Sequence, residues 1–204
     1  MKVYTDLVSE KYQRDLIQAT NDMPWYFRPK IANFSNSVDG KDEFKDPRVT
    51  DAPAFTHTFV SNGRLHSEFY QYFMPVLEAF EKRENVTIEN VIRVRGRLTT
   101  PITGHTLEKY NPPHVDLMSP TPFKTLVYYV YDSDGDTIFF DKFFEFGQER
   151  IKNVDLNKVF SHTPKQGHAV YFDGWQYHAG NTPVNYNSRC IINFDFTLKE
   201  KYER

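Results

Sequence analysis

Apolar residues recur at helical spacing in residues 6–20. Val8, Tyr12 and Leu16 lie four positions apart, which places them on one face of an α-helix. Two prolines end this pattern soon afterwards. Residues 35–54 are polar and rich in turn-forming residues, so we predict a long exposed loop there, and a lid is one role that loops of this length take.

The strongest helical pattern lies in residues 62–83. We expect its apolar stripe to lie in the core, and its members are Leu65, Phe69, Tyr72, Phe73, Val76, Leu77 and Phe80. Pro75 lies inside the pattern. It predicts a kink or a division into two helices, because proline cannot donate the backbone hydrogen bond that a helix interior requires.

From residue 90 onward the pattern changes to short β-like runs separated by Gly, Pro, Asn and Asp. The runs are "NVIRVRGRL", "HTLEKY", "HVDLM", "KTLVYYVYD", "DTIFFD", "KFFEF", "HAVYFD" and "SRCIINFDF". Many short strands at close spacing predict a sandwich or barrel. We therefore expect a mainly β fold with N-terminal helices in a single domain, 1–204. Helical support and loops would occupy 1–89, and the β core would occupy 90–198.

Composition agrees with a β-dominated core and excludes other classes. Aromatic residues make up 16% of the 204 residues, and their rings pack well on pleated surfaces. The net charge of −2 gives no basic footprint for a nucleic acid. The single cysteine, Cys190, allows no internal disulfide. The chain shows no signal-peptide pattern and no long apolar run, so we expect a cytoplasmic protein without a membrane span.

The stretch "YNPPHVDLM" places His114 and Asp116 two residues apart. On a strand, residues at this spacing point to the same face, whereas on a helix they diverge. The two prolines just before the pair favour extended backbone, so both side chains are expected to face one cavity. His66 and Glu68 have the same spacing but lie within the predicted helix, so we do not expect them to chelate a metal together.

A metal site needs a third ligand, and the other histidines are the candidates: His57, His66, His105, His162, His168 and His178. His178 is the best choice because a turn after the run "HAVYFD" would bring a late strand back beside the first. Two histidines and one carboxylate leave three coordination positions open, which suits Fe(II) with an organic chelator and O₂. The alternative is an ordinary surface His–Asp pair.

Arg189 follows at the start of the last β-run. Strand alternation puts Arg189, Ile191 and Asn193 on one face. A buried guanidinium needs a partner, and it binds a carboxylate through two parallel hydrogen bonds. A dicarboxylate that chelates the metal at one end would place its far carboxylate here. A structural ion pair is the alternative role for Arg189.

The set His114-x-Asp116, His178 and Arg189, with the segment "TPVNYNSR", resembles the Fe(II)/2-oxoglutarate-dependent dioxygenase superfamily. It looks most like the prolyl-4-hydroxylase-like branch, which has phage and bacterial members. The resemblance covers about residues 90–198 and implies a double-stranded β-helix, the cupin-like jelly roll. It also implies His114, Asp116 and His178 as catalytic metal ligands, and Arg189 as the partner of the 2-oxoglutarate C5 carboxylate.

The same resemblance suggests further cosubstrate contacts. "KTLVYYVYD" resembles the family's second core strand, which implies that the Tyr129 hydroxyl binds the C5 carboxylate. "GDTIFF" resembles the family's Gly-Gly-x-Thr-x-Phe segment. Asn193 stands where relatives often have Thr or Ser, and Tyr110 stands near the expected site entrance. Arg97, on the strand before the motif, is expected to face the cavity. Core packing is the alternative role for Tyr129, Asn193 and Tyr110.

The implied activity is that of an enzyme that hydroxylates a C–H bond of a prolyl, peptidyl or small-molecule substrate and releases succinate and CO₂. Its cofactors would be Fe(II), 2-oxoglutarate and O₂, with ascorbate as a further candidate. Two alternatives stay open. A nucleic-acid demethylase of the same superfamily is disfavoured by the near-neutral charge. A cupin-like metal-binding isomerase or non-catalytic binder would not need Arg189. The substrate itself is not encoded in features shared by the superfamily.

Overall fold

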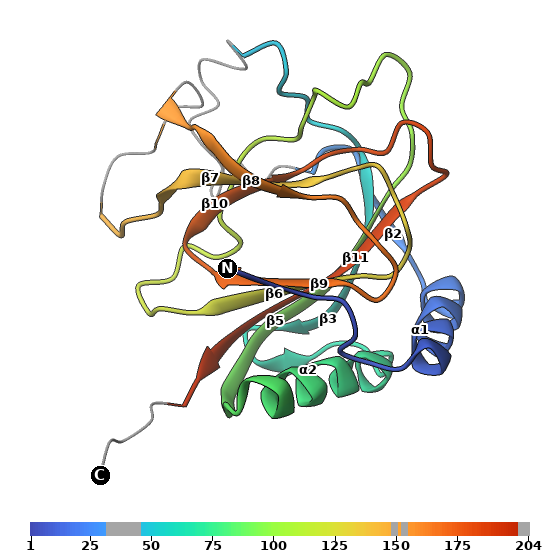
Figure 1. Ribbon diagram of the computed structural model, residues 1–204, viewed down its shortest axis with the longest axis vertical. Coiled ribbons are helices and arrows are strands. Elements are labelled where there is room, and N and C mark those ends of the chain that lie inside the picture. Colours follow the sequence, from blue (N-terminus) through green and yellow to red (C-terminus); the bar gives the residue numbers. More distant parts are fainter. Residues whose placement is uncertain (32–45, 148–150, 152–154, 200–204) are drawn as a thin grey trace.

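The computed structural model describes residues 1–31, 46–147, 151 and 155–199. Its elements, in chain order, are β1 (Lys2–Tyr4), α1 (Glu10–Asp22), β2 (Tyr26–Arg28), β3 (Ala54–Ser61), β4 (Arg64–Leu65), α2 (Tyr70–Glu84), β5 (Ile88–Thr99), β6 (Lys124–Tyr129), β7 (Thr137–Phe143), β8 (Lys158–His162), β9 (Ala169–Asp173), β10 (Gln176–Gly180) and β11 (Arg189–Leu198). The larger sheet has the order β1-β9-β6-β11-β5-β3-β2, with β4 beside β3. The smaller sheet has the order β10-β7-β8 (Figure 1).

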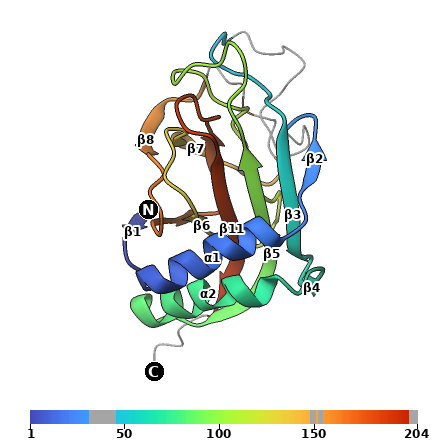
Figure 2. The ribbon, with the colours of Figure 1, turned by 90° about the vertical axis from the view of Figure 1, so that its right-hand side faces the viewer.

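The strands form a two-layer jelly roll with the helices on its outside. Figure 2 shows α1 and α2 side by side across the outer face of the larger sheet. A core cluster of Phe59, Phe73, Phe80, Phe194 and other buried residues lies between the helices and that sheet. A second cluster, which includes Tyr129, Phe139 and Phe172, fills the space between the two sheets. The prediction of a mainly β jelly-roll fold with helices near the N-terminus is confirmed.

Helix α1 confirms the first helical pattern but begins later than expected. Ser9 precedes the helix in an extended conformation, and its side chain accepts a hydrogen bond from the Tyr12 backbone N–H at 3.3 Å. Such N-caps satisfy amide groups that the first helical turn leaves without partners. Leu16 lies on the buried face and is only 1% exposed, so the predicted apolar face is the one that packs on the sheet.

Helix α2 begins at Tyr70, and the prediction of a helix over 62–83 is therefore wrong for its first eight residues. Asn62 and Gly63 both have positive φ and turn the chain between β3 and β4. His66 and Glu68 consequently precede the helix instead of lying within it. Pro75 does not divide α2, which runs unbroken from Tyr70 to Glu84.

Strand β3 is the main element that the sequence analysis did not expect. It lies between β2 and β5, so the part of the chain before residue 90 contributes strands as well as helices and loops. Conversely, the runs "HTLEKY" and "HVDLM" form no regular strand. They contribute only single bridges, Tyr110 to Val49 and His114 to His178.

Most of the predicted 35–54 loop lies outside the described residues. The described part, from residue 46, is held to Tyr110 by backbone hydrogen bonds from Thr50 N–H to Tyr110 C=O and from Tyr110 N–H to Arg48 C=O, both 2.8 Å. Ala54 then begins β3. In the part of the chain that the structure describes, neither helix has the length and apolarity needed to cross a membrane.

Phe80 is the best single test of the helix–sheet core. It is fully buried, and its ring lies 4.9 Å from that of Tyr171 and 5.5 Å from that of Phe196. Phe80→Ala should lower the free energy of unfolding by about 3–5 kcal/mol, measured by urea denaturation, because it leaves a cavity. Phe146→Ala is the control, because Phe146 is 67% exposed and its loss should cost under about 0.5 kcal/mol. Equal losses in both variants would contradict this account of the core.

Candidate active site

His114, Asp116 and His178 come together between the two sheets. His114 lies just outside the smaller sheet and pairs with His178 of β10 through two backbone hydrogen bonds of 2.9 and 3.0 Å. A β-bulge between Gln176 and His178 shifts the register of β10 against β7, and bulges of this kind re-aim side chains. One potential ligand atom from each of the three residues lies within 4.8 Å of the others. Among the described residues, no other group of His, Cys, Asp and Glu has this geometry.

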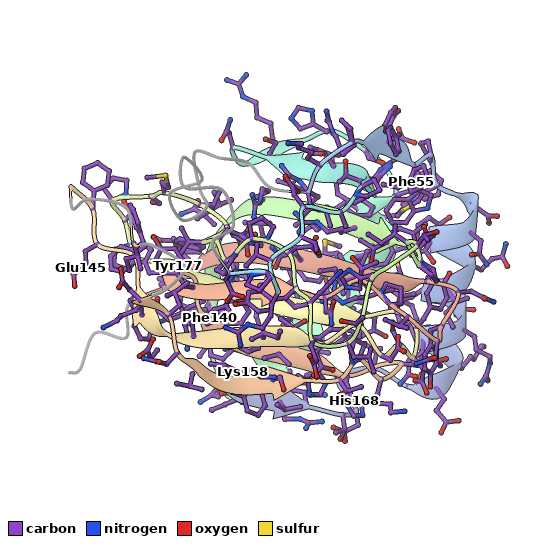
Figure 3. The ribbon with its side chains drawn as sticks, turned by 90° about the horizontal axis from the view of Figure 1, so that it is seen from above. Phe55, Phe140, Glu145, Lys158, His168 and Tyr177 are labelled. Atoms are coloured by element: carbon purple, nitrogen blue, oxygen red, sulfur yellow. The ribbon has the colours of Figure 1, made fainter. Side chains whose placement is uncertain are left out.

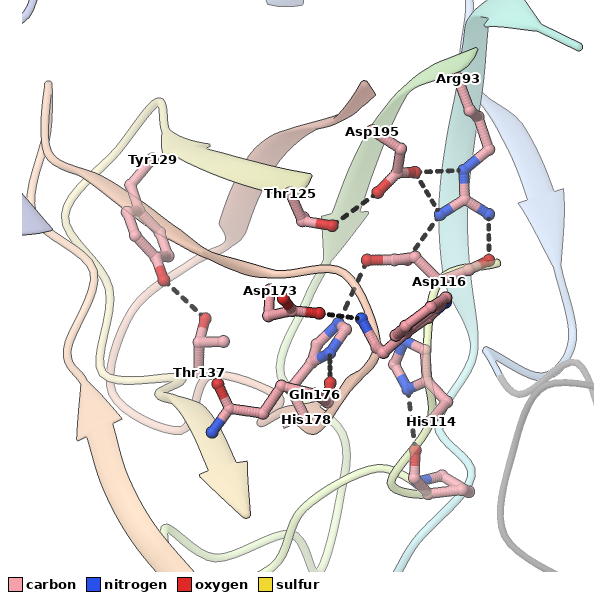
Figure 4. A network of polar contacts seen from close by, with 12 residues as sticks. Arg93, His114, Asp116, Thr125, Tyr129, Thr137, Asp173, Gln176, His178 and Asp195 are labelled. Atoms are coloured by element: carbon pink, nitrogen blue, oxygen red, sulfur yellow. Dashed lines mark hydrogen bonds and ion pairs between the residues drawn. The ribbon is translucent and has the colours of Figure 1, made fainter. Parts of the chain in front are cut away.

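The two imidazole rings are oriented by backbone carbonyl groups. His114 Nδ1 lies 3.0 Å from the Pro112 carbonyl oxygen, and His178 Nδ1 lies 3.0 Å from that of Gln176 (Figure 4). A carbonyl oxygen only accepts hydrogen bonds, so each Nδ1 carries the proton and each Nε2 keeps its lone pair for a metal. Burial and the neighbouring His178 lower the pKa of His114 to about 3, so its ring is neutral at pH 7.

Asp116 is held by Arg93 of β5. The Arg93 guanidinium donates to Asp116 Oδ1 at 2.6 Å and to the Asp116 backbone oxygen at 2.9 Å. Its Nε donates to Asp195 Oδ2 at 2.8 Å, and Thr125 donates to the other oxygen of Asp195 at 2.8 Å (Figure 4). The second Asp116 oxygen, Oδ2, lies 3.3 Å from His178 Nε2. The network thus leaves one carboxylate oxygen directed at the histidines.

The charges of this network oppose the effect of burial. Burial alone would raise the pKa of Asp116, but the charge of Arg93 outweighs it and, together with the contact to His178, holds that pKa well below its usual range. Burial raises the pKa of Asp195 to about 6, although Arg93 acts in the opposite direction. Asp116 is therefore ionised at neutral pH, as a metal ligand must be.

Arg189 is fully enclosed and lacks a carboxylate partner. It is 3% exposed, and among the described residues no ion pair to it is found. Its Nε donates to the Gly135 carbonyl oxygen at 2.6 Å, and one terminal nitrogen donates to Thr137 Oγ1 at 2.7 Å. Only glycine fits at position 135, because a Cβ there would lie 2.8 Å from Arg189 Cδ. The structural ion pair considered for Arg189 is thus absent from the described residues.

One pocket joins the three candidate ligands to Arg189. It has about 470 Å³ of empty space, part of which is open to the outside, and it is lined by Arg93, Arg95, Arg97, His114, Asp116, Val127, Thr137, His178, Gly180, Arg189, Ile191 and Asn193. Strand alternation predicts that one face of β11 carries Arg189, Ile191 and Asn193, and all three line this pocket. Arg97 faces the pocket, as expected.

The two candidate tyrosines differ in position. Tyr129 is fully buried, and its hydroxyl donates at 2.7 Å to the same Thr137 oxygen that Arg189 binds. Tyr110 does not line the pocket and packs instead in a cluster with Phe140 and Tyr177 of the smaller sheet; the latter two are labelled in Figure 3. Its hydroxyl donates to Asp46 at 3.1 Å, so the structure does not bring Tyr110 to the predicted site entrance.

Sequence reasoning missed Arg93, Arg95, Thr125 and Asp195. The signal was present in "RVRGR", where alternate arginines of a predicted strand share one face. Of the remaining histidines, His57 binds Pro24 and Ser67, and His105 binds Asn181. None of them joins the group formed by His114, Asp116 and His178.

Comparison with family models and with curated proteins by sequence finds no match. Comparison with solved structures finds a 2OG-Fe(II) oxygenase family oxidoreductase from Burkholderia pseudomallei, with a TM-score of 0.61, 10% identity, and 94% of this chain and 81% of that chain covered. The non-heme alpha ketoglutarate dependent epimerase SnoN from nogalamycin biosynthesis matches with a TM-score of 0.59, 10% identity, and 96% and 76% covered.

A third solved structure is the viral collagen prolyl hydroxylase of Paramecium Bursaria Chlorella virus-1. It has a TM-score of 0.50 and 15% identity, with 96% of this chain and 94% of that chain covered. At such identities the likeness shows the fold alone. The chain therefore has the fold of 2OG-Fe(II) oxygenases, which confirms the resemblance inferred from the sequence at the level of the fold, prolyl hydroxylases included.

We expect Arg93 to control metal affinity through Asp116. Arg93→Gln should weaken Mn²⁺ binding about 10–100-fold, measured by calorimetry, because residues that orient a ligand contribute this much. Arg93→Lys keeps the positive charge but loses the guanidinium's two-pronged geometry, so its Mn²⁺ affinity should lie between those of wild type and Arg93→Gln. The control is Lys124→Gln, which removes an ion pair to Asp173 of 2.7 Å that does not touch the ligands. Unchanged affinity in Arg93→Gln would show that Asp116 does not need this anchor.

The metal-free protein should lose stability on acidification. The folded His114 does not bind a proton until about pH 3, whereas the unfolded chain binds it near pH 6.5, so between these values the unfolded state holds more protons. From pH 7 to pH 5, His114 alone should remove about 2 kcal/mol of stability, measured by urea denaturation. His114→Asn should have a correspondingly flatter profile. Identical slopes for both proteins would refute this assignment.

Proposed function

We propose that this chain is an Fe(II)- and 2-oxoglutarate-dependent oxygenase that hydroxylates a C–H bond. One observation carries the proposal: two histidines and a carboxylate converge in the same pocket as a buried arginine without a carboxylate partner. The first set suits a metal that keeps open positions. The second suits the far carboxylate of a dicarboxylic acid.

The donor set fits Fe(II). His114 and His178 would bind through Nε2 and Asp116 through a carboxylate oxygen. All three donors are buried or nearly so, and at neutral pH the His114 ring is neutral and Asp116 is ionised, as a metal requires. Fe(II) would activate O₂, the oxidant, while 2-oxoglutarate is oxidised to succinate and CO₂ and the substrate C–H bond to C–OH.

The other residues of the pocket would bind and shield the cosubstrate. Arg189 would bind the C5 carboxylate, held in place by Gly135 and by the Thr137 hydroxyl, while Tyr129 would orient Thr137 from behind. Phe139 and Phe172 pack on the His178 ring, with centroids 6.2 and 4.9 Å away, and would keep water from that side of the metal.

We propose that the whole chain acts as one oxygenase domain, because strands from before residue 90 complete the larger sheet. The two alternative functions have less support. An isomerase or a non-catalytic metal binder would not need the enclosed Arg189, because neither binds the far carboxylate of a 2-oxo acid. The nucleic-acid demethylase would need phosphate contacts, and the chain's net charge is −2. A peptidyl or small-molecule C–H donor is the better candidate.

The decisive experiment measures succinate formation with Fe(II), 2-oxoglutarate and O₂. Wild-type protein should release succinate slowly even without a substrate, and His114→Ala should release none. Arg189→Ala should raise the KM for 2-oxoglutarate at least about tenfold, since a charge-assisted bidentate contact is worth more than 1.4 kcal/mol.

The matched control is Arg64→Ala, which removes an exposed arginine of β4. It should change neither the rate of succinate release nor the KM for 2-oxoglutarate. Activity retained in His114→Ala would show that the ligand set is wrong. An unchanged KM in Arg189→Ala would remove the cosubstrate assignment while leaving the metal site intact.

A further inference from the structure

Strand β5 places three arginines on the face that lines the pocket, namely Arg93, Arg95 and Arg97. Arg93 is paired with Asp116 and Asp195. Within the described residues, Arg95 and Arg97 form no ion pair and no side-chain hydrogen bond. Two of the three guanidinium groups therefore face the pocket with their donors unused.

This arrangement is unfavourable without a ligand. Burial and the charge of Arg95 lower the pKa of Arg97 to about 10, and burial and the charge of Arg93 lower that of Arg95. Holding such groups partly out of water without a partner costs free energy, and an anion between them would offset that cost.

The pocket stays positive even when the proposed cofactors are counted. Four arginines line it, and two carboxylates, Asp116 and Asp195, oppose them. Fe(II) would add two positive charges and 2-oxoglutarate two negative charges, so the excess of two positive charges remains. Because Arg189 would be occupied by the cosubstrate, the excess lies at Arg95 and Arg97.

Asn193 provides a second observation at the same place. It pairs with Arg95 across β5 and β11, lines the pocket and is 8% exposed. Its side-chain oxygen has no hydrogen-bond partner among the described residues. A buried acceptor of this kind is normally satisfied, so a ligand with a donor group next to its anionic group would complete the site.

We propose that Arg95 and Arg97 bind an oxyanion group, a carboxylate or a phosphate, of a small-molecule primary substrate, and that Asn193 accepts a hydrogen bond from the same molecule. The inference rests on the proposed function, because the Arg189 end of the pocket is assigned to 2-oxoglutarate. The enclosed pocket favours a small molecule over a macromolecule.

Anion binding can be tested without knowing the substrate. Protein loaded with Mn²⁺ and saturating 2-oxoglutarate is titrated with acetate and, separately, with inorganic phosphate, and the melting temperature is recorded. Acetamide serves as the uncharged control. A saturable rise in melting temperature is expected with at least one anion, since a ligand of the folded state stabilises it. The more effective anion identifies the substrate's oxyanion group.

Arg95→Gln and Arg97→Gln should each weaken this anion effect at least tenfold. Without anions they should melt no lower than wild type, because each removes an unpaired charge. Arg64→Gln, the exposed arginine control, should respond as wild type does. The absence of a saturable anion effect in wild type, or an equal effect in Arg95→Gln, would overturn the proposal.

The cosubstrate is monitored in parallel by calorimetry. If Arg95→Gln and Arg97→Gln instead weaken 2-oxoglutarate binding tenfold, and no second anion binds, the two arginines belong to the cosubstrate site and the proposal fails. If wild type binds neither Mn²⁺ nor 2-oxoglutarate, the proposed function fails. The anion titration of metal-free protein would then still decide whether Arg95 and Arg97 form an anion site.

Discussion

The contact between Arg93 and its two carboxylates is the interaction on which the candidate site depends. Arg93, Asp116 and Asp195 are buried together, and Arg93 is the cation that pairs with both carboxylates. Removing one partner of such a cluster leaves an uncompensated charge, which is more costly than never having built it. The cluster joins β5, β11 and the segment that carries Asp116, so the position of the carboxylate ligand follows from the sheet itself.

Local rules predicted the parts of the site that local geometry determines. The i, i+2 spacing of His114 and Asp116 put both side chains in one cavity even though the segment forms a single bridge and no full strand. The same alternation placed Arg189 and Asn193 on one wall. These predictions held because the direction of a side chain on extended backbone depends on parity alone. The metal and cosubstrate roles themselves came from resemblance and stay proposals.

The failures have equally physical causes. The apolar stripe of residues 62–83 includes Leu65 and Phe69 and predicted a helix from residue 62. Asn62 and Gly63 have positive φ and form a hairpin turn instead, so the helix begins only at Tyr70. Strand β3 was missed because its main pairing is with β5, a contact that no local pattern of residues 54–61 specifies. The roles of Arg93 and Asp195 depend on contacts across 102 positions, which no local pattern specifies. Tyr110 was expected near the site entrance from the family resemblance alone, and its side chain packs instead with Phe140 and Tyr177.

The bulge in β10 has a consequence for how this protein can change over time. Because the register of β10 against β7 shifts between Gln176 and His178 and side chains alternate along a strand, gaining or losing one amino acid there would turn the imidazole out of the cavity. Lineages of this protein should therefore keep the lengths of β10 and of the turn that joins it to β9 constant, while the connections at the pocket's mouth are free to lengthen or shorten. Diversification of what enters the cavity would be confined to those connections and to point replacements along β5.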